Sequence, residues 1–459
     1  MRKNSLYILI ILFMLLGFFG AKIGIEGIII LLALFAFACV ILAKYETVTY
    51  ILALYPFIDY GLRSFVPSLA SIWDELLLIV MFGVWLYKYF IYRKENNVKQ
   101  TPLDMPVILF IVAMIIVLIL NSPDYRISLE GFRAVIQYIL WYFAIVQLLK
   151  DEKSAKTLCL IFILVVSIMA IHGVYQFVIG VEMPAGWVDS KEAGVRTRVF
   201  SILTSPNILG SLMTLASPIC FSFVFMAKEI GKKILFLFLA MMMMGTLIFT
   251  FSRGAWIGFG AAICLYVFLK DKRLFIPVII AGILVVFLVP GVGNRITYML
   301  SPEYIESSLR GGRLVRWIDG LRILSTTPTF GVGLGHFGGA VAMNNELSYA
   351  LGTETISTYY MDNYYLKTAV ETGLFGVFTF IMLMYQVIIN GFRTINITKS
   401  KEIKELEKGI IAGLFGVIIH NFVENVFEVP MMTSCFWLLV AVLMHLWYIN
   451  YNKAKALAN

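Results

Sequence analysis

Long apolar runs recur from one end of the chain to the other, and this recurrence limits the folds that the chain can adopt. A helix needs about 20 predominantly apolar residues to cross a hydrocarbon core of roughly 30 Å. Such runs fill most of the 459 residues, of which 60% are hydrophobic and 14% are charged. The sequence therefore predicts an all-α fold, a polytopic membrane helical bundle with about 12 to 14 transmembrane helices.

The upper limit of 14 spans comes from counting every apolar run. The third run is the weakest because Pro56, Asp59 and Arg63 interrupt it. No soluble domain, long linker or internal repeat stands out, so residues 1–459 are predicted to form a single integral membrane domain. The predicted spans lie near residues 5–20, 25–43, 48–63, 72–92, 104–121, 128–149, 156–179, 206–227, 233–250, 254–270, 274–290, 364–391, 408–427 and 431–450.

Lysine and arginine cluster in short loops, which lie at residues 93–99, 150–156, 228–233, 270–273 and 393–408. Such loops face the cytoplasm in membrane proteins. The chain is therefore predicted to be a multi-pass protein of the cytoplasmic membrane, in contact with membrane lipids and with both termini inside. The net charge of +9 is explained by these loops, and no nucleic-acid partner is predicted. The outer segments are then 122–127, 180–205, 251–253 and the large extracytoplasmic loop 291–362, which is predicted to contain short helices.

The five cysteines each lie in or beside an apolar run, without CxxC spacing. This pattern is typical of inert packing residues, and it supports neither a disulfide framework nor a metal site. The sequence predicts no metal and no cofactor.

Arginines on the outer side are informative because topology does not require them there. Arg253 lies between two apolar runs, where a charge is costly unless it snorkels, pairs or faces a polar cavity. A guanidinium near the outer surface suits capture of a phosphate group, and snorkelling to headgroups is the alternative. Arg198 has the same two interpretations, as a phosphate ligand or as a loop charge paired with Asp189 or Glu192.

The large loop contains a stretch, Gly311–Leu324, that is predicted to form an amphipathic helix. Arg313 falls at the border of its apolar stripe, where a charge needs a partner, and a substrate anion is one candidate. An amphipathic helix lying on the bilayer is the competing interpretation of the whole stretch. The predicted stripe consists of Leu314, Trp317, Ile318, Leu321 and Leu324, and Arg316, Asp319 and Arg322 are predicted to form the opposite, water-exposed face.

Glycine occupies alternate positions at Gly331, Gly333 and Gly335. No strand, GxGxxG motif or P-loop lysine accompanies the run, so a nucleotide loop is not indicated. The run predicts a turn that approaches another backbone closely. His336 is predicted to be a structural loop residue.

Asp362 opens the span that follows the large loop, and two interpretations are open. It is a favoured helix N-cap, or it is a general base at a cleft near arginines. Two further polar pairs follow with a spacing of four residues, Lys367 with Glu371 and His420 with Glu424. Both pairs are predicted to be mainly structural and to line the same cavity.

These motifs together resemble the superfamily of bacterial O-antigen ligases and Wzy-type polysaccharide polymerases. They follow in the order of that superfamily over roughly 180 residues. The matching pieces are Arg198–Asn207, Ser252-Arg253-Gly254, Gly312-Arg313 with Trp317, Pro328–Phe337, and Asp362 to Gly373.

The resemblance implies a metal-independent membrane glycosyltransferase with a GT-C-like helical fold. Such enzymes transfer a glycan from undecaprenyl diphosphate to a glycan or lipid acceptor hydroxyl outside the cytoplasmic membrane, alongside chain-length regulators or flippases. Arg198, Arg253 and Arg313 would bind the diphosphate. Arg313, Arg253 and Asp362 would carry the catalysis.

The sequence departs from the ligases of this superfamily at Asp362, where they usually carry histidine. Aspartate cannot supply neutral imidazole chemistry, so a polymerase is favoured over a ligase that moves finished glycan onto lipid A core, a protein or another anchor. A transporter or flippase is the third alternative. It would predict internal repeats and charged, broken helices at mid-membrane, whereas the charges here gather toward the outer end.

Overall fold

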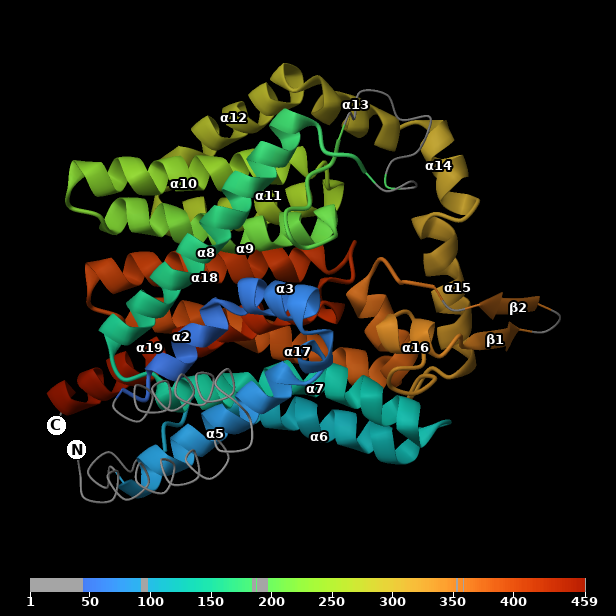
Figure 1. Cartoon of the computed structure of the whole chain (residues 1–459), viewed down its shortest axis with the longest axis horizontal. Helices are drawn as coiled ribbons and strands as arrows, with labels where there is room; N and C mark the ends of the chain where they lie inside the picture. Colours follow the sequence, from blue (N-terminus) through green and yellow to red (C-terminus); the bar gives the residue numbers. More distant parts are fainter. Residues whose placement is uncertain are drawn as a thin grey trace, which may run out of the picture.

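The computed structural model describes residues 44–91, 98–183, 187, 197–351, 354–357 and 359–458. In this part of the chain helices dominate, and two short strands form one hairpin (Figure 1). The predicted spans 5–20 and 25–43 lie outside the described residues, as do Asp189 and Glu192, the two loop partners considered for Arg198. The all-α prediction is confirmed.

The helices lie in this order: α2 (Thr47–Ala53), α3 (Tyr55–Phe65), α4 (Pro67–Ala70), α5 (Trp73–Ile91), α6 (Asp104–Leu120), α7 (Tyr125–Leu148), α8 (Glu152–Ile179), α9 (Pro206–Met226), α10 (Ile230–Phe249), α11 (Arg253–Lys270), α12 (Phe275–Leu288), α13 (Pro290–Met299), α14 (Pro302–Leu309), α15 (Arg313–Thr326), α16 (Ala340–Asn344), α17 (Tyr364–Ile397), α18 (Lys401–His420) and α19 (Pro430–Ala458). Single 3₁₀ turns occur at η2 (Lys272–Leu274) and η3 (Val426–Glu428). The strands are β1 (Ser348–Leu351) and β2 (Glu354–Ser357), which pair antiparallel with Ser348 opposite Ser357.

Seven helices of the described residues, α7 to α11, α17 and α19, are long and apolar enough to cross a membrane. Helices α12 and α13 form one further candidate, a span bent by 95°. The third predicted span is divided into α2 and α3, and α6 has only 17 residues. The chain is thus a polytopic membrane protein, and a total of 12 to 14 spans stays a prediction.

The centre of the bundle is the packing of α18 against α9 and α11. Small residues make this approach close, as is common between membrane helices. A Cβ at Gly413 would overlap the carbonyl oxygen of Leu215, and a Cβ at Gly258 would lie 2.7 Å from the carbonyl oxygen of Gly416. Helix α18 ends at His420, earlier than the predicted boundary at residue 427. The residues that follow His420 therefore lie in a loop.

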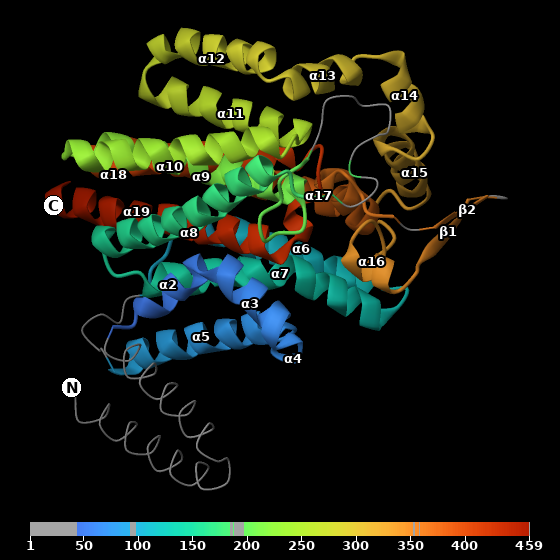
Figure 2. The same cartoon turned by 45° about the horizontal axis from the view of Figure 1, so that its top comes forward.

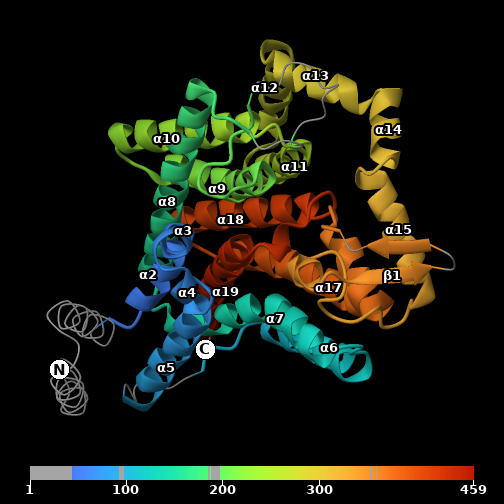
Figure 3. The same cartoon turned by 45° about the vertical axis from the view of Figure 1, so that its right-hand side comes forward.

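The large loop folds into short helices, as the sequence predicts. Figure 2 shows α12, α13 and α14 in series along one edge of the bundle. Figure 3 shows that α15 then brings the chain back to α17, on which it packs. The hairpin of β1 and β2 projects away from the bundle beside this contact (Figure 1).

The predicted apolar stripe of α15 is partly wrong. Ile318 and Leu321 are 47% and 56% exposed, whereas Ile323 is buried. The helix docks through Gly320, where a Cβ would lie 3.4 Å from the Leu366 side chain of α17. The small glycine permits this contact, and it turns the face with Ile323 toward α17.

The glycine run packs against a break in α17, at Gly373, which the sequence did not predict. The N–H of Val332 donates to the carbonyl of Val370 over 2.8 Å. The N–H of Leu374 donates to the carbonyl of Pro328, also over 2.8 Å. In an unbroken helix Leu374 would donate to Val370, so the loop supplies both partners that the break removes. The predicted close approach of two backbones is confirmed.

Gly331→Ala should destabilise the protein, because Gly331 has φ +71° and its Cβ would overlap the backbone of Val370 and Glu371. We expect the free energy of unfolding to fall by more than about 1 kcal/mol, measured as a lower midpoint of thermal unfolding in detergent. The control is Gly61→Ala in α3, where a Cβ meets nothing within 4 Å. Equal midpoints for the two variants would contradict this packing.

Candidate functional site

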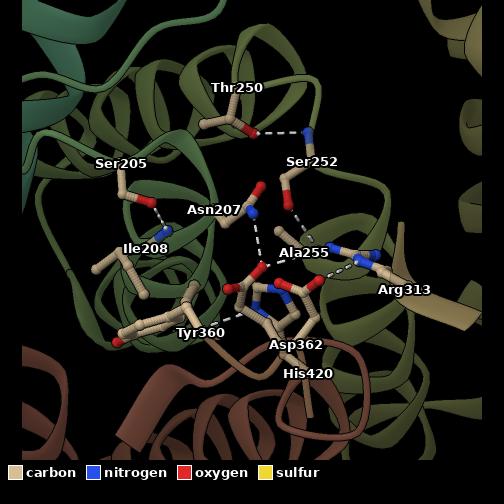
Figure 4. A network of polar contacts seen from close by, with 12 residues as sticks. Ser205, Asn207, Ile208, Thr250, Ser252, Ala255, Arg313, Tyr360, Asp362 and His420 are labelled. Carbon is tan, nitrogen blue, oxygen red and sulfur yellow. Dashed lines mark hydrogen bonds and ion pairs between the residues drawn. The ribbon is translucent and has the colours of Figure 1, made fainter. Parts of the chain in front are cut away.

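Several helices begin or end at one end of the bundle, around the residues that Figure 4 shows. Helices α9, α11, α15 and α17 begin there, and α18 ends there. Ser205 caps α9 by accepting from the N–H of Ile208, and Ser252 caps α11 by accepting from the N–H of Ala255. Helix N-termini carry partial positive charge and bind anions. The fold therefore prepares this end of the bundle for a negatively charged ligand.

Arg313, the first residue of α15, lies between two carboxylates. Its Nε lies 3.7 Å from Oδ2 of Asp362, and its Nη2 lies 3.5 Å from Oε2 of Glu424. Asp362 Oδ2 also accepts from Nη1 of Arg316 over 3.0 Å. The sequence predicted that Arg313 needs a partner, and in this structure two protein carboxylates serve as partners.

The prediction of a water-exposed face on α15 is wrong for Arg316. Arg316 pairs with Asp362, and its Nη1 also donates to the carbonyl of Tyr360 over 3.4 Å. Arg322 and Asp319 do pair with each other, over 3.4 Å. Their i, i+3 spacing is local to the helix, but the partner of Arg316 is 46 residues away. Helix periodicity alone therefore could not reveal it.

Asp362 is not the N-cap of α17. That position is held by Asn363, whose side chain accepts from the N–H of Leu366 over 3.0 Å. The N-cap interpretation of Asp362 is wrong. Its carboxylate instead pairs with Arg313 and Arg316. Its role as a general base stays a prediction at this point.

Asn207 joins the site, and the sequence did not single it out for chemistry. Its Nδ2 donates to Oε2 of Glu424 over 2.6 Å. Its Oδ1 accepts from Nη2 of Arg198 over 2.8 Å. The signals were its place beside a helix start, after Ser205 and Pro206, and its position in the matching piece Arg198–Asn207.

Arg198 is buried, and it donates hydrogen bonds to several groups of the described residues. Besides Asn207, these include the carbonyls of Thr250, over 2.9 Å, and of Trp187, over 2.8 Å. The side chain therefore positions Asn207. Direct contact of Arg198 with a diphosphate stays a prediction.

Arg253 lies at the start of α11, and its guanidinium stacks on the ring of Tyr304 of α14, with 4.7 Å from Cζ to the ring centroid. Its Nη1 is buried and has no hydrogen-bond partner among the described residues. Buried donors without partners are rare in proteins. This one suits an anionic ligand that approaches between α11 and α14.

His420 and Glu424 are brought to the same cluster. His420 is buried, its Nδ1 lies 3.0 Å from Oγ of Ser211, and a Cβ at Gly254 would lie 2.9 Å from its ring. Glu424 is buried in the loop after α18. Burial raises the pKa of its carboxyl above the ordinary value, and Arg313 opposes this rise.

Lys367 and Glu371 form a separate network. Lys367 Nζ lies 2.8 Å from Glu371 and 3.1 Å from Glu428. Glu371 accepts from the N–H of Phe337, and Glu428 accepts from the N–H of Ala340. The pair thus holds the part of the large loop around Phe337 and Ala340 against α17, which agrees with the predicted structural role. A cavity shared with His420 and Glu424 stays a prediction.

The sequence predicts neither a metal nor a cofactor. Within the ranges that the structure describes, no group of three or more His, Cys, Asp and Glu side chains is arranged to hold a metal ion. The cluster around Arg313 offers guanidinium groups and helix N-termini instead. Its chemistry is that of an anion site.

One comparison with known proteins matches part of the chain. Residues 236–381, from α10 to α17, match the model of the family described as O-antigen ligase. We refer to this segment as the O-antigen ligase domain. The predicted resemblance to the O-antigen ligase and Wzy superfamily is confirmed over this segment, and the match supports a membrane glycan-transfer enzyme. No curated protein matches the chain.

The O-antigen ligase domain contains Arg253, Arg313 and Asp362. Arg198, Asn207, His420 and Glu424 lie outside the matched segment. The fold nevertheless places Asn207 in contact with Glu424, and Glu424 in contact with Arg313. The site is therefore built from both sides of the domain.

Lys367→Met should destabilise the O-antigen ligase domain strongly, because the side chains of Lys367 and Glu371 are only 5% and 3% exposed. Removing the cation leaves two buried carboxylates uncompensated, which costs about 3–5 kcal/mol. The matched control is Lys453→Met, which breaks an exposed pair with Glu152 and should cost less than about 1 kcal/mol. Thermal unfolding in detergent measures both. A midpoint for Lys367→Met as high as that of Lys453→Met would rule out the structural role.

Proposed function

We propose that the chain transfers a glycan from undecaprenyl diphosphate to an acceptor hydroxyl at the outer face of the cytoplasmic membrane, as a cell-surface polysaccharide polymerase. The observation that carries this proposal is the arginine cluster at the converging helix ends, within and beside an O-antigen ligase domain. The donor is a diphosphate that leaves with negative charge. Guanidinium groups stabilise such a charge as it develops.

The charge balance of the cluster supports a diphosphate ligand. Among the described residues, Arg313 and Arg316 pair with Asp362 and Glu424, and Arg253 adds a third guanidinium with a buried, unpartnered Nη1. A diphosphate esterified at both ends carries one ionised oxygen on each phosphorus. The excess of guanidinium groups would offset part of that negative charge.

The reaction is a substitution at the anomeric carbon of the donor glycan. The acceptor oxygen forms a bond to this carbon, and the bond from the carbon to the diphosphate oxygen breaks. Arg313 and Arg253 bind the leaving diphosphate, and a carboxylate takes the proton of the acceptor hydroxyl. Attack from the side opposite the leaving group gives inversion of the anomeric configuration.

Polymerase is preferred to ligase because Asp362 occupies the position at which the ligases usually have histidine. The description of the matching family favours the second candidate, transfer of finished glycan onto lipid A core, a protein or another anchor. A flippase is less well supported, because the ionic cluster lies at one end of the bundle rather than midway along the helices.

Reconstitution in liposomes tests the proposal. The purified protein is given undecaprenyl-diphosphate repeats alone, and then the same repeats together with a lipid A core acceptor. We expect longer lipid-linked glycans without ATP in the first reaction. Product on the lipid A core alone would replace polymerase by ligase. Movement of repeats across the bilayer without new glycosidic bonds would contradict the proposal.

Arg313→Ala and Arg253→Ala should each lower transfer by about 100-fold or more, as expected for the loss of a group that stabilises developing charge. Glycan length on gels measures the activity. The control is Arg322→Ala on the same helix as Arg313, which removes the pair with Asp319. It should retain activity within about threefold, since surface substitutions away from a site have small effects. Near-normal transfer by both site variants would remove the diphosphate assignment.

A further inference from the structure

Two carboxylates share Arg313, but their remaining partners differ. Asp362 has a second guanidinium, Arg316, with a separation of 3.0 Å between Nη1 and Oδ2. Glu424 has a neutral amide instead, with Nδ2 of Asn207 2.6 Å from Oε2. Asp362 therefore stays paired with a cation even if Arg313 moves away. Glu424 does not.

The difference decides which carboxylate can take a proton. A guanidinium beside a carboxylate favours its charged form and so weakens it as a base. Burial acts in the opposite direction on Glu424, whose pKa is raised above the ordinary value by desolvation, while Arg313 opposes the rise. If Arg313 leaves, the main opposing cation is gone. Glu424 then becomes a stronger base than it is while Arg313 contacts it.

Arg313 is suited to such an exchange. Its contacts with the two carboxylates, 3.5 and 3.7 Å, are longer than the roughly 2.7–2.9 Å of a strong charge-assisted hydrogen bond. Its side chain is 27% exposed, compared with 8% for Glu424. A bound diphosphate can accept two parallel hydrogen bonds from the guanidinium at shorter distances. The shortest ion pair of the cluster is that of Arg316 with Asp362, over 3.0 Å.

We propose that Glu424 is the general base of the transfer, and that the donor diphosphate activates it by drawing Arg313 away. This inference rests on the proposed function and names a second catalytic carboxylate for it. The proton of the acceptor hydroxyl moves to the carboxylate of Glu424 as the acceptor oxygen bonds to the anomeric carbon. The electron pair of the broken bond leaves with the diphosphate. Glu424 is thus free of its ion pair with Arg313, and able to accept the proton, only when a donor is bound.

Asn207 and Arg198 are positioning residues in this account. Asn207 orients the Glu424 carboxylate through Oε2, and Arg198 fixes the amide of Asn207 from behind over 2.8 Å. Arg198 is itself held by two backbone carbonyls. A rigid neutral donor keeps the carboxylate in place while leaving it free to accept a proton.

Carboxylate rescue tests the identity of the base. Glu424→Gln, which keeps the shape of the side chain, should lower the transfer rate by about 100-fold or more. It should still bind undecaprenyl diphosphate within about threefold of the wild-type affinity, as a base rather than a binding group would. Glu424→Ala should regain at least about tenfold of its rate in formate, which supplies a carboxylate in the vacated space. Asp362→Ala is the matched control, and formate should not restore it.

The outcomes separate this inference from the proposed function. A wild-type protein that forms no glycosidic bond removes the proposed function. With active wild type, normal transfer by Glu424→Gln, or rescue of Asp362→Ala instead of Glu424→Ala, overturns the assignment of Glu424. Loss of undecaprenyl diphosphate binding by a folded Glu424→Gln protein also overturns it, because the residue would then act in binding.

A pH profile tests the unlocking by donor. Among the described residues, the titratable groups that interact with Glu424 are Arg313 on α15 and Asp362 and Tyr360 before α17. The profile of kcat/KM reports the free enzyme and that of kcat the donor complex. Because Arg313 leaves Glu424 on binding, the acidic limb of kcat should have the higher pKa. An equal or lower pKa, or an acidic limb that persists in Glu424→Gln, contradicts the unlocking.

Discussion

The position of Arg313 between Asp362 and Glu424 is the contact on which the rest of the site depends. Arg313 is the first residue of α15, Asp362 lies just before α17, and Glu424 lies just after α18. One guanidinium therefore contacts side chains from segments that are far apart in the sequence. Because both contacts are long, the same interaction that assembles the site can be given up to a substrate.

Shorter hydrogen bonds and ion pairs hold the backbone around this contact. The break in α17 at Gly373 is filled by the glycine run, and Lys367 ties α17 to Glu428 in η3. The backbone of Gly338 adds two further links, since its carbonyl accepts from the N–H of Met361 and from Nδ2 of Asn425, each over 3.0 Å. These bonds fix the residue before Asp362 and the residue after Glu424. The carboxylates are therefore held in place independently of Arg313.

The fold class and much of the site could be predicted from the sequence. Apolar length fixes helices in a membrane, and a charge at the edge of an apolar stripe indicated that Arg313 needs a partner. Arg253 was singled out as a charge that needs a partner, and its Nη1 has none among the described residues. These predictions succeeded because they depend on local cost, which each short stretch of sequence carries.

The missed features depend on contacts between distant segments. Arg316 was assigned to a water-exposed face because helix periodicity shows its neighbours on α15 but not Asp362. The break in α17 was missed because its missing hydrogen-bond partners come from the loop that contains Pro328. Asn207 looked like an ordinary helix start until α18 placed Glu424 beside it. Each required the tertiary fold.

The most direct test of the account is the structure of the protein with undecaprenyl diphosphate bound, determined in lipid nanodiscs by electron cryomicroscopy. The account predicts the diphosphate at the helix ends of Figure 4, with the Arg313 guanidinium hydrogen-bonded to it and separated from Glu424. Arg316 should still pair with Asp362. A diphosphate bound elsewhere, with Arg313 still between the two carboxylates, would contradict the account.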